Sequence, residues 1–116
     1  MALKSEIVET IRHMMPSNAE IQVVEEGNGF SVGVAWKLND DLERPNKMSK
    51  TISIHVSSEV AQDFENVSGR EKAEAYRRLS EFLSRKLAEF EPHHDTQKYK
   101  PPPVERWLID TKLLFG

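Results

Sequence analysis

The chain has 116 residues and no cysteine, and its 16 Lys and Arg against 19 Asp and Glu give a formal net charge of −3. With 30% charged and 38% hydrophobic residues, it fits one small soluble globular domain and excludes a multidomain enzyme and a disulfide-held secreted scaffold. No apolar run approaches the roughly 20 residues of a membrane helix, and the charged N-terminus lacks the apolar region of a signal peptide. We therefore expect a cytoplasmic protein without membrane contact.

The N-terminal segment is predicted to be a helix over residues 3–15, because its apolar residues recur at spacings of three and four. Pro16 ends this helix, since the residue before a proline avoids the helical region. The apolar stripe consists of Leu3, Ile7, Ile11 and Met14 or Met15.

Three strands are predicted next, over residues 21–26, 30–38 and 51–56. The first two are joined by Gly27, Asn28 and Gly29, a cluster that suits a tight hairpin turn. Residues 30–38 alternate strictly between large apolar residues and small or polar ones, which is typical of a strand with one buried face. Connections of this kind predict an antiparallel meander.

Two features of this region predict how the second strand packs and where the chain is mobile. Gly33 and other small residues occupy the second face of the strand 30–38, which indicates close packing there or a sharp twist. The loop 39–49 is long and polar and lacks apolar anchors, so we expect it to be the most mobile internal segment.

Two helices are predicted after the third strand. Ser57 and Ser58 can cap a short helix over residues 59–64. Ser68 and Glu71 have the spacing of a capping box, which opens a long helix reaching about Phe90. The apolar stripe of the long helix consists of Tyr76, Leu79, Leu83, Leu87 and Phe90.

The predicted fold class is α+β, with a three-stranded antiparallel meander, helices packed on one of its faces, and the order α-β-β-β-α-α. Residues 1–92 form the single domain, and residues 93–116 form a proline-containing tail with an apolar docking segment. The predicted core brings two helix residues, Leu79 and Leu83, onto the sheet. The sheet contributes Phe30, Val32, Val34, Trp36, Ile52 and Ile54.

The tail is unusual because seven large apolar residues lie within residues 104–115, behind the three prolines 101–103. Three consecutive prolines hold an extended strut. Exposing this much apolar surface is costly, since burying one such side chain contributes roughly 1.5–3 kcal/mol. We expect the tail to dock on the sheet and the first helix, or to be exchanged with a second copy of the chain.

The sequence offers little for catalysis or metal binding. There is no cysteine, and no serine has the setting of a nucleophile elbow. His93, His94 and Asp95 form the one metal-like cluster, but a zinc site needs three or four ligands at fixed spacing. His55 is interpreted as a surface or packing residue. We therefore predict a protein that is not an enzyme and uses no cofactor.

The order helix, three strands, helix over residues 2–90 resembles that of double-stranded-RNA-binding domains. The resemblance implies phosphate contacts at the start of the last helix. Here that position, residues 69–73, has one acid between two bases. Arg77 and Arg78 share their helix face with Glu74 and Glu81, and an acidic chain is poorly suited to phosphate binding.

We therefore expect a small binding or regulatory module that acts through protein contacts, with a protein partner or a second copy as a homodimer. A nucleic-acid-binding domain is the alternative. The candidate interaction surface combines apolar residues of the tail with two bases of the polar loop. These residues are Trp107, Leu108, Leu114, Phe115, Arg44 and Lys47.

Overall fold

The computed structural model describes residues 3–38, 49–91 and 104–116 of the chain. In chain order its elements are α1 (Leu3–Met14), β1 (Glu20–Glu26), β2 (Gly29–Ala35), β3 (Thr51–Ser57), α2 (Ser58–Asn66), α3 (Gly69–Glu89), β4 (Val104–Ile109) and α4 (Thr111–Phe115).

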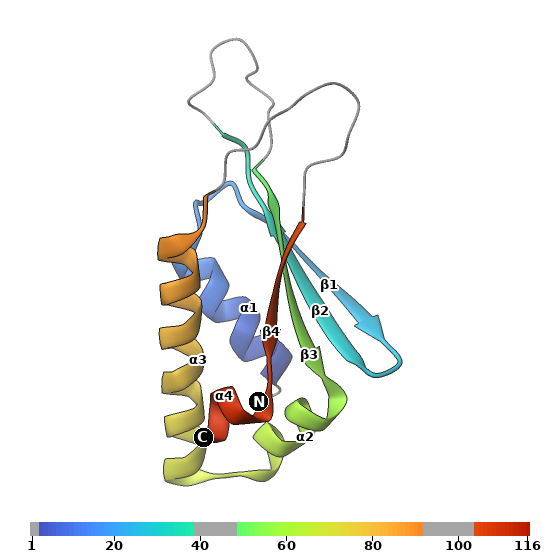
Figure 1. The fold of residues 1–116 in the computed structure, drawn as a ribbon, viewed down its shortest axis with the longest axis vertical. Coiled ribbons are helices and arrows are strands. Elements are labelled where there is room, and N and C mark those ends of the chain that lie inside the picture. The colour runs from blue at the N-terminus through green and yellow to red at the C-terminus, as the bar shows by residue number, and fades with distance from the viewer. Residues whose placement is uncertain (1–2, 39–48, 92–103) are drawn as a thin grey trace.

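The strands form one sheet in the order β1-β2-β3-β4 (Figure 1). β1, β2 and β3 pair antiparallel, as the predicted meander requires, whereas β4 pairs parallel with β3. The α+β class is confirmed, but the three-stranded sheet is corrected to a mixed sheet of four strands. The additional strand comes from the tail, whose apolar residues carried no clear period in the sequence.

The long helices α1 and α3 lie on the same side of the sheet (Figure 1). Strands β2 and β3 each alternate between buried and half-buried positions, so their buried side chains all point toward this helical layer. Every residue predicted for the core is buried, including Leu79 and Leu83 of α3. The strand and helix periodicities therefore identify the same core from both sides.

Gly29 is required by the way the hairpin meets β3. Its φ is +149°, and a Cβ placed there would lie 2.1 Å from the carbonyl oxygen of Val56. Gly33 is not restricted in this way, because a Cβ placed there would lie 3.7 Å from the carbonyl oxygen of Gln22, an ordinary contact. Nothing in the described residues packs closely on Gly33, although its place on the strand had suggested that.

The two helices after β3 begin differently. Ser57 caps α2, and its hydroxyl accepts a hydrogen bond from the backbone N–H of Val60 at 3.3 Å. Ser68 precedes α3 but makes no capping hydrogen bond, so the predicted capping box is wrong. The first residue of α3 is instead Gly69, whose φ of +57° lies in the left-handed region.

The apolar stripe of α3 is rotated slightly from its predicted position. Ala75 is fully buried, whereas Tyr76 is 37% exposed. The Tyr76 hydroxyl lies 3.2 Å from that of the buried Thr10 on α1, so the two long helices share a polar contact. The smaller Ala75 therefore takes the buried position on α3.

The tail docks mainly on β3 and α3. Contact with the sheet had been expected, but the helix that the tail mainly contacts is α3 and not the first helix. Trp107 and Ile109 of β4 point into the core, and α4 packs against α3. Phe90, just after α3, makes edge-to-face contacts with Trp36 at 5.7 Å and Trp107 at 6.1 Å between ring centroids. The aromatic group therefore joins β4 to the remainder of the core.

Several sequence features fall outside the described residues. They include residues 39–48 of the polar loop, the cluster His93, His94 and Asp95, and the proline strut. Ser49, at the end of the loop, is fully buried. Its N–H donates to the carbonyl of Trp36 at 2.7 Å, and its hydroxyl accepts from the N–H of Trp36 at 3.0 Å. The loop therefore re-enters the sheet at a fixed point.

Candidate functional site

The sheet face opposite α1 and α3 carries no covering element among the described residues (Figure 1). Register fixes its side-chain pattern, because directly paired residues project from the same face. One row across all four strands is Val24, Ser31, His55 and Leu108. The adjacent row is Gln22, Gly33, Ser53 and Arg106. We call this surface the open face.

The open face carries the most exposed large apolar side chains of the described residues. Leu108 is 65% exposed, Val104 is 56% and Val24 is 49%. All three project from its outer strands, β1 and β4, and flank small or polar residues on the inner strands. The three side chains share one face, but the polar residues Ser31, His55 and Arg106 lie between them.

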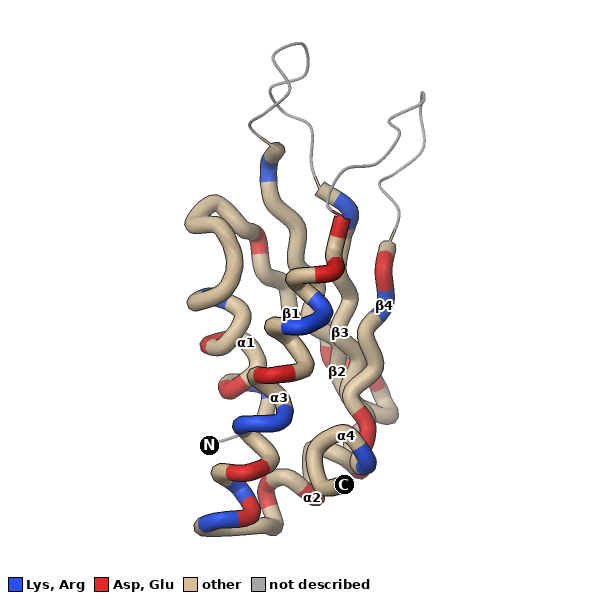
Figure 2. The backbone as a smooth tube through the Cα atoms, turned by 60° about the vertical axis from the view of Figure 1, so that its left-hand side comes forward, with Lys and Arg blue, Asp and Glu red and all other residues tan. Residues whose placement is uncertain are grey.

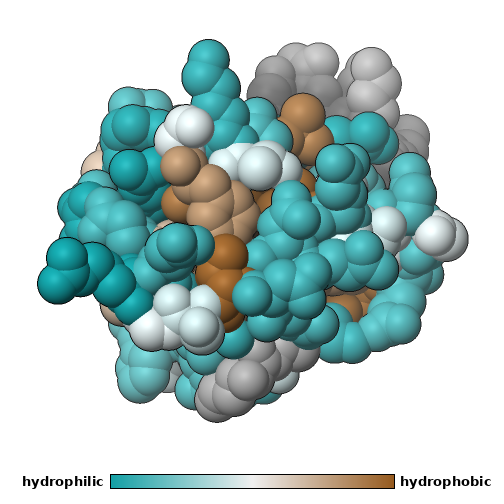
Figure 3. Space-filling view, turned by 90° about the horizontal axis from the view of Figure 1, so that it is seen from below, coloured by the Kyte–Doolittle hydropathy of each residue, from teal (hydrophilic) through white to brown (hydrophobic). Residues whose placement is uncertain are grey.

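The end of the molecule formed by α2 and α4 provides a comparison with the open face. Viewed from that end, the molecule is covered mainly by hydrophilic residues, with a small apolar group near the centre (Figure 3). None of the three most exposed large apolar residues belongs to either helix. The three most exposed large apolar side chains described therefore belong to the sheet.

A polar cluster lies within the open face. The Ser31 hydroxyl donates to Glu26 at 3.1 Å and lies 3.2 Å from the Nδ1 atom of His55. The Glu26 carboxylate is itself 3.5 Å from the same Nδ1 atom. Because these residues come from three neighbouring strands, the cluster ties β1, β2 and β3 together.

The three residue types of a hydrolytic triad are present, but their arrangement is not that of a triad. In a triad the serine and the acid contact different nitrogens of the imidazole, so that the histidine can take the serine proton while the acid orients it. Here Ser31 and Glu26 both lie at Nδ1 of His55. The geometry suits a structural hydrogen-bond cluster better than nucleophile activation.

Arg106 contributes an unpaired positive charge to this surface, and Glu20 of β1 contributes a negative one at its far edge. Arg106 lines a hollow of about 190 Å³ together with the polar cluster, Ser53 and Leu108. Its side chain is exposed and makes no hydrogen bond or ion pair with any other residue that the structure describes. The hollow thus combines a free guanidinium with one apolar side chain, that of Leu108.

The residues predicted for the interaction surface separate into four groups. Trp107 and Leu114 are each 1% exposed and belong to the core of the chain. Phe115 is half-buried against the core, while Leu108 stands on the open face. Arg44 and Lys47 lie outside the described residues. Sequence reasoning missed Val24 and Arg106, because their common face depends on the unpredicted strand β4.

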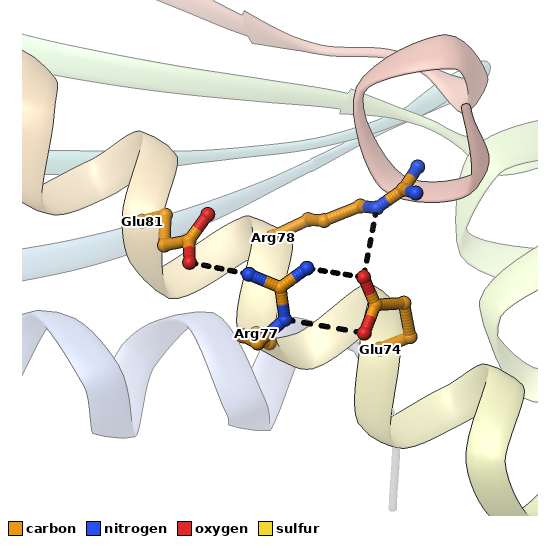
Figure 4. A network of polar contacts seen from close by, with 4 residues as sticks. All are labelled: Glu74, Arg77, Arg78 and Glu81. Atoms are coloured by element: carbon orange, nitrogen blue, oxygen red, sulfur yellow. Dashed lines mark hydrogen bonds and ion pairs between the residues drawn. The ribbon is translucent and has the colours of Figure 1, made fainter.

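Two of the six basic residues of α3, Arg77 and Arg78, are engaged in ion pairs. Arg77 contacts both Glu74 and Glu81, and Arg78 reaches Glu74 at 3.4 Å (Figure 4). Hydrogen bonding from Arg77 holds the pKa of the Glu74 carboxyl below its ordinary value. Blue and red segments alternate along α3 (Figure 2), so its surface carries no uniformly basic stripe.

A second hollow lies between α1 and β1 and is more open to solvent. Its lining includes Val8, Val23, Lys4 and Glu25, and the last two form an ion pair with each other. The described residues contain no group of three or more His, Cys, Asp or Glu placed to hold a metal ion. None of the helices they form is both long and apolar enough to cross a membrane.

Comparison of the chain with protein-family models, curated proteins and solved structures finds no match in any of the three.

Proposed function

We propose that this protein is a non-enzymatic binding module that docks a protein partner on the open face of its sheet. The observation that carries the proposal is the placement of Leu108, Val104 and Val24, the most exposed large apolar residues described, on the one face without helices. A face that carries exposed large apolar side chains among polar ones is compatible with a protein interaction site.

The chemistry of the open face supports binding rather than catalysis. An activated serine needs an imidazole nitrogen of its own, and Ser31 shares Nδ1 of His55 with Glu26. The described residues also offer no metal cluster that would activate a water molecule. Contact area and charge are therefore the properties that this surface provides.

Position-dependent photo-crosslinking in the native host tests the proposal. A photoreactive phenylalanine analogue replaces Leu108 on the open face, and in a matched variant it replaces Ala73, an exposed residue of α3. We expect a discrete adduct with one protein from position 108 and not from position 73. The same adduct from both positions, or none from position 108, would refute the docking surface.

Nucleic-acid binding is the alternative, suggested by the order of the first elements. It has weaker support, because Arg77 and Arg78 of α3 are paired with acids and the chain is acidic overall. The test is binding to duplex RNA and to DNA at increasing salt, since phosphate contacts lose affinity steeply with salt. Salt-sensitive binding that Arg70→Glu and Lys72→Glu abolish would favour this alternative.

A further inference from the structure

The size of the open face limits what can cover it. Four strands about 4.8 Å apart, each about 20 Å long, present about 400 Å² in plan. Each partner in a standard protein interface contributes about 800 Å². A second copy of the chain packed face to face would bury too little for a stable dimer. A single segment of a partner protein matches the area much better.

The shape of the open face suits a helix lying along the strands. Val24 and Leu108 occupy the two outer strands of one row, three strand spacings or about 14 Å apart. The next row carries Gly33 and Ser53 on the inner strands, so the centre of that row is lower than its rims, whereas His55 occupies an inner strand of the first row. An α-helix with its side chains is about 10–12 Å wide, and this width fits between Val24 and Leu108.

The charge of Arg106 indicates which charge the partner segment should carry. Arg106 alternates with Val104 and Leu108 along β4, so all three project from the same face. Glu26, the acid that lines the same hollow, already accepts a hydrogen bond from Ser31 and lies beside His55, while Glu20 lies three strands away on β1. An incoming carboxylate would therefore meet an unpaired guanidinium, which binds carboxylates through two parallel hydrogen bonds.

We propose that the open face binds one amphipathic α-helix of a partner protein, with apolar side chains against Leu108 and Val24 and an acidic side chain on Arg106. The inference rests on the proposed docking function and specifies its partner. About 20 Å of strand corresponds to 13 or 14 helical residues, roughly four turns. The partner helix is therefore short, apolar on one side, and acidic at the position that faces β4.

The experiment uses a displayed library of random 18-residue peptides selected on the purified full-length protein. Peptides that bind are synthesised, and their affinities are measured against the wild type, Arg106→Glu and Leu108→Asp. Arg70→Glu serves as the matched control, because Arg70 is an exposed arginine on the helical layer. We expect selected peptides to become helical on binding and to carry an acid among apolar residues spaced three and four apart.

Arg106→Glu should weaken these peptides at least tenfold, while Arg70→Glu leaves their affinity unchanged. Replacing the peptide acid by lysine should restore binding to Arg106→Glu, a charge exchange that a folding defect cannot imitate. Peptides that lose binding to Leu108→Asp but not to Arg106→Glu would overturn the acidic-helix inference and leave the docking surface standing. If no selected peptide responds to either variant, both proposals fail.

Discussion

Trp107 and Leu108 are neighbours in sequence that lie on opposite faces of the sheet. Trp107 is 1% exposed and packs under α3, whereas Leu108 is 65% exposed on the open face. The alternation of β4 thus divides the apolar tail into residues that complete the core and residues that remain available to a partner. The structural role of the tail and its proposed binding role can therefore be separated by mutation.

The two roles predict different effects on stability. Trp107→Ala removes a buried aromatic ring that contacts Phe90, and we expect a loss of roughly 3–5 kcal/mol in the free energy of unfolding. Leu108→Ala should change it by no more than about 0.5 kcal/mol. Urea unfolding of both variants measures the difference. Equal losses would mean that Leu108 is also part of the core.

The two strand glycines provide a second matched pair. Gly29→Ala would force a Cβ to 2.1 Å from the carbonyl oxygen of Val56 at a positive φ. We therefore expect it to lower the free energy of unfolding by about 1–3 kcal/mol. Gly33→Ala meets only an ordinary contact at 3.7 Å. We expect it to stabilise the strand by about 0.5–1 kcal/mol. Thermal unfolding that ranks them the other way would contradict the hairpin geometry.

Ser49 is expected to matter more than a loop serine usually does. Ser49→Ala leaves the buried N–H of Trp36 without the hydroxyl that now accepts from it at 3.0 Å. Leaving such a donor unsatisfied costs about 1–3 kcal/mol. Ser5→Ala, at an exposed position of α1, should be neutral or slightly stabilising. Chemical denaturation that shows the same small effect for both would argue against the Trp36–Ser49 link.

The ion pair between Lys4 and Glu25 predicts a pH dependence. A hydrogen bond from the Lys4 ammonium, together with its charge, holds the pKa of the Glu25 carboxyl below its ordinary value of 4.5. A pKa lower in the folded state contributes stability above the unfolded value, and that contribution is lost as the pH falls through the folded value. The stabilisation should therefore be complete at neutral pH and disappear progressively below about pH 5.

Carboxyl chemical shifts followed by NMR titration measure this effect directly. We expect the Glu25 midpoint below 4.5 in the wild type and close to 4.5 in Lys4→Met. Glu6, a carboxylate on α1 outside this pair, serves as the internal reference. A Glu25 midpoint that Lys4→Met does not move would show that the pair is absent in solution.

The sequence predicts the central strands and the helical layer well, because their residues have clear periods. Alternation in residues 30–38 and the three-and-four spacing on α3 place Val32, Val34 and Leu79 on facing surfaces, and all three are fully buried. Such local periodicity does not depend on which elements become neighbours. The positions that it predicts to be buried are therefore buried in the folded chain.

The open face could not be predicted in the same way, because it is assembled from residues distant in sequence. Val24 and Leu108 belong to one row only because β4 adds to the edge of β3 in parallel. Parallel pairing depends on a long connection and leaves no turn signal of its own. The tail also mixes buried Trp107 and Ile109 with exposed Val104 and Leu108, and so short an alternation does not by itself distinguish an extended segment from a helix.

The most direct test of the docking surface is the affinity of the purified protein for the partner identified by crosslinking at position 108. Leu108→Asp should weaken that affinity at least tenfold while leaving the unfolding midpoint in place. Ala73→Asp, which adds the same charge on the helical layer, should leave the affinity unchanged. Unchanged affinity in Leu108→Asp, or an equal loss in both variants, would show that the open face is not where the partner binds.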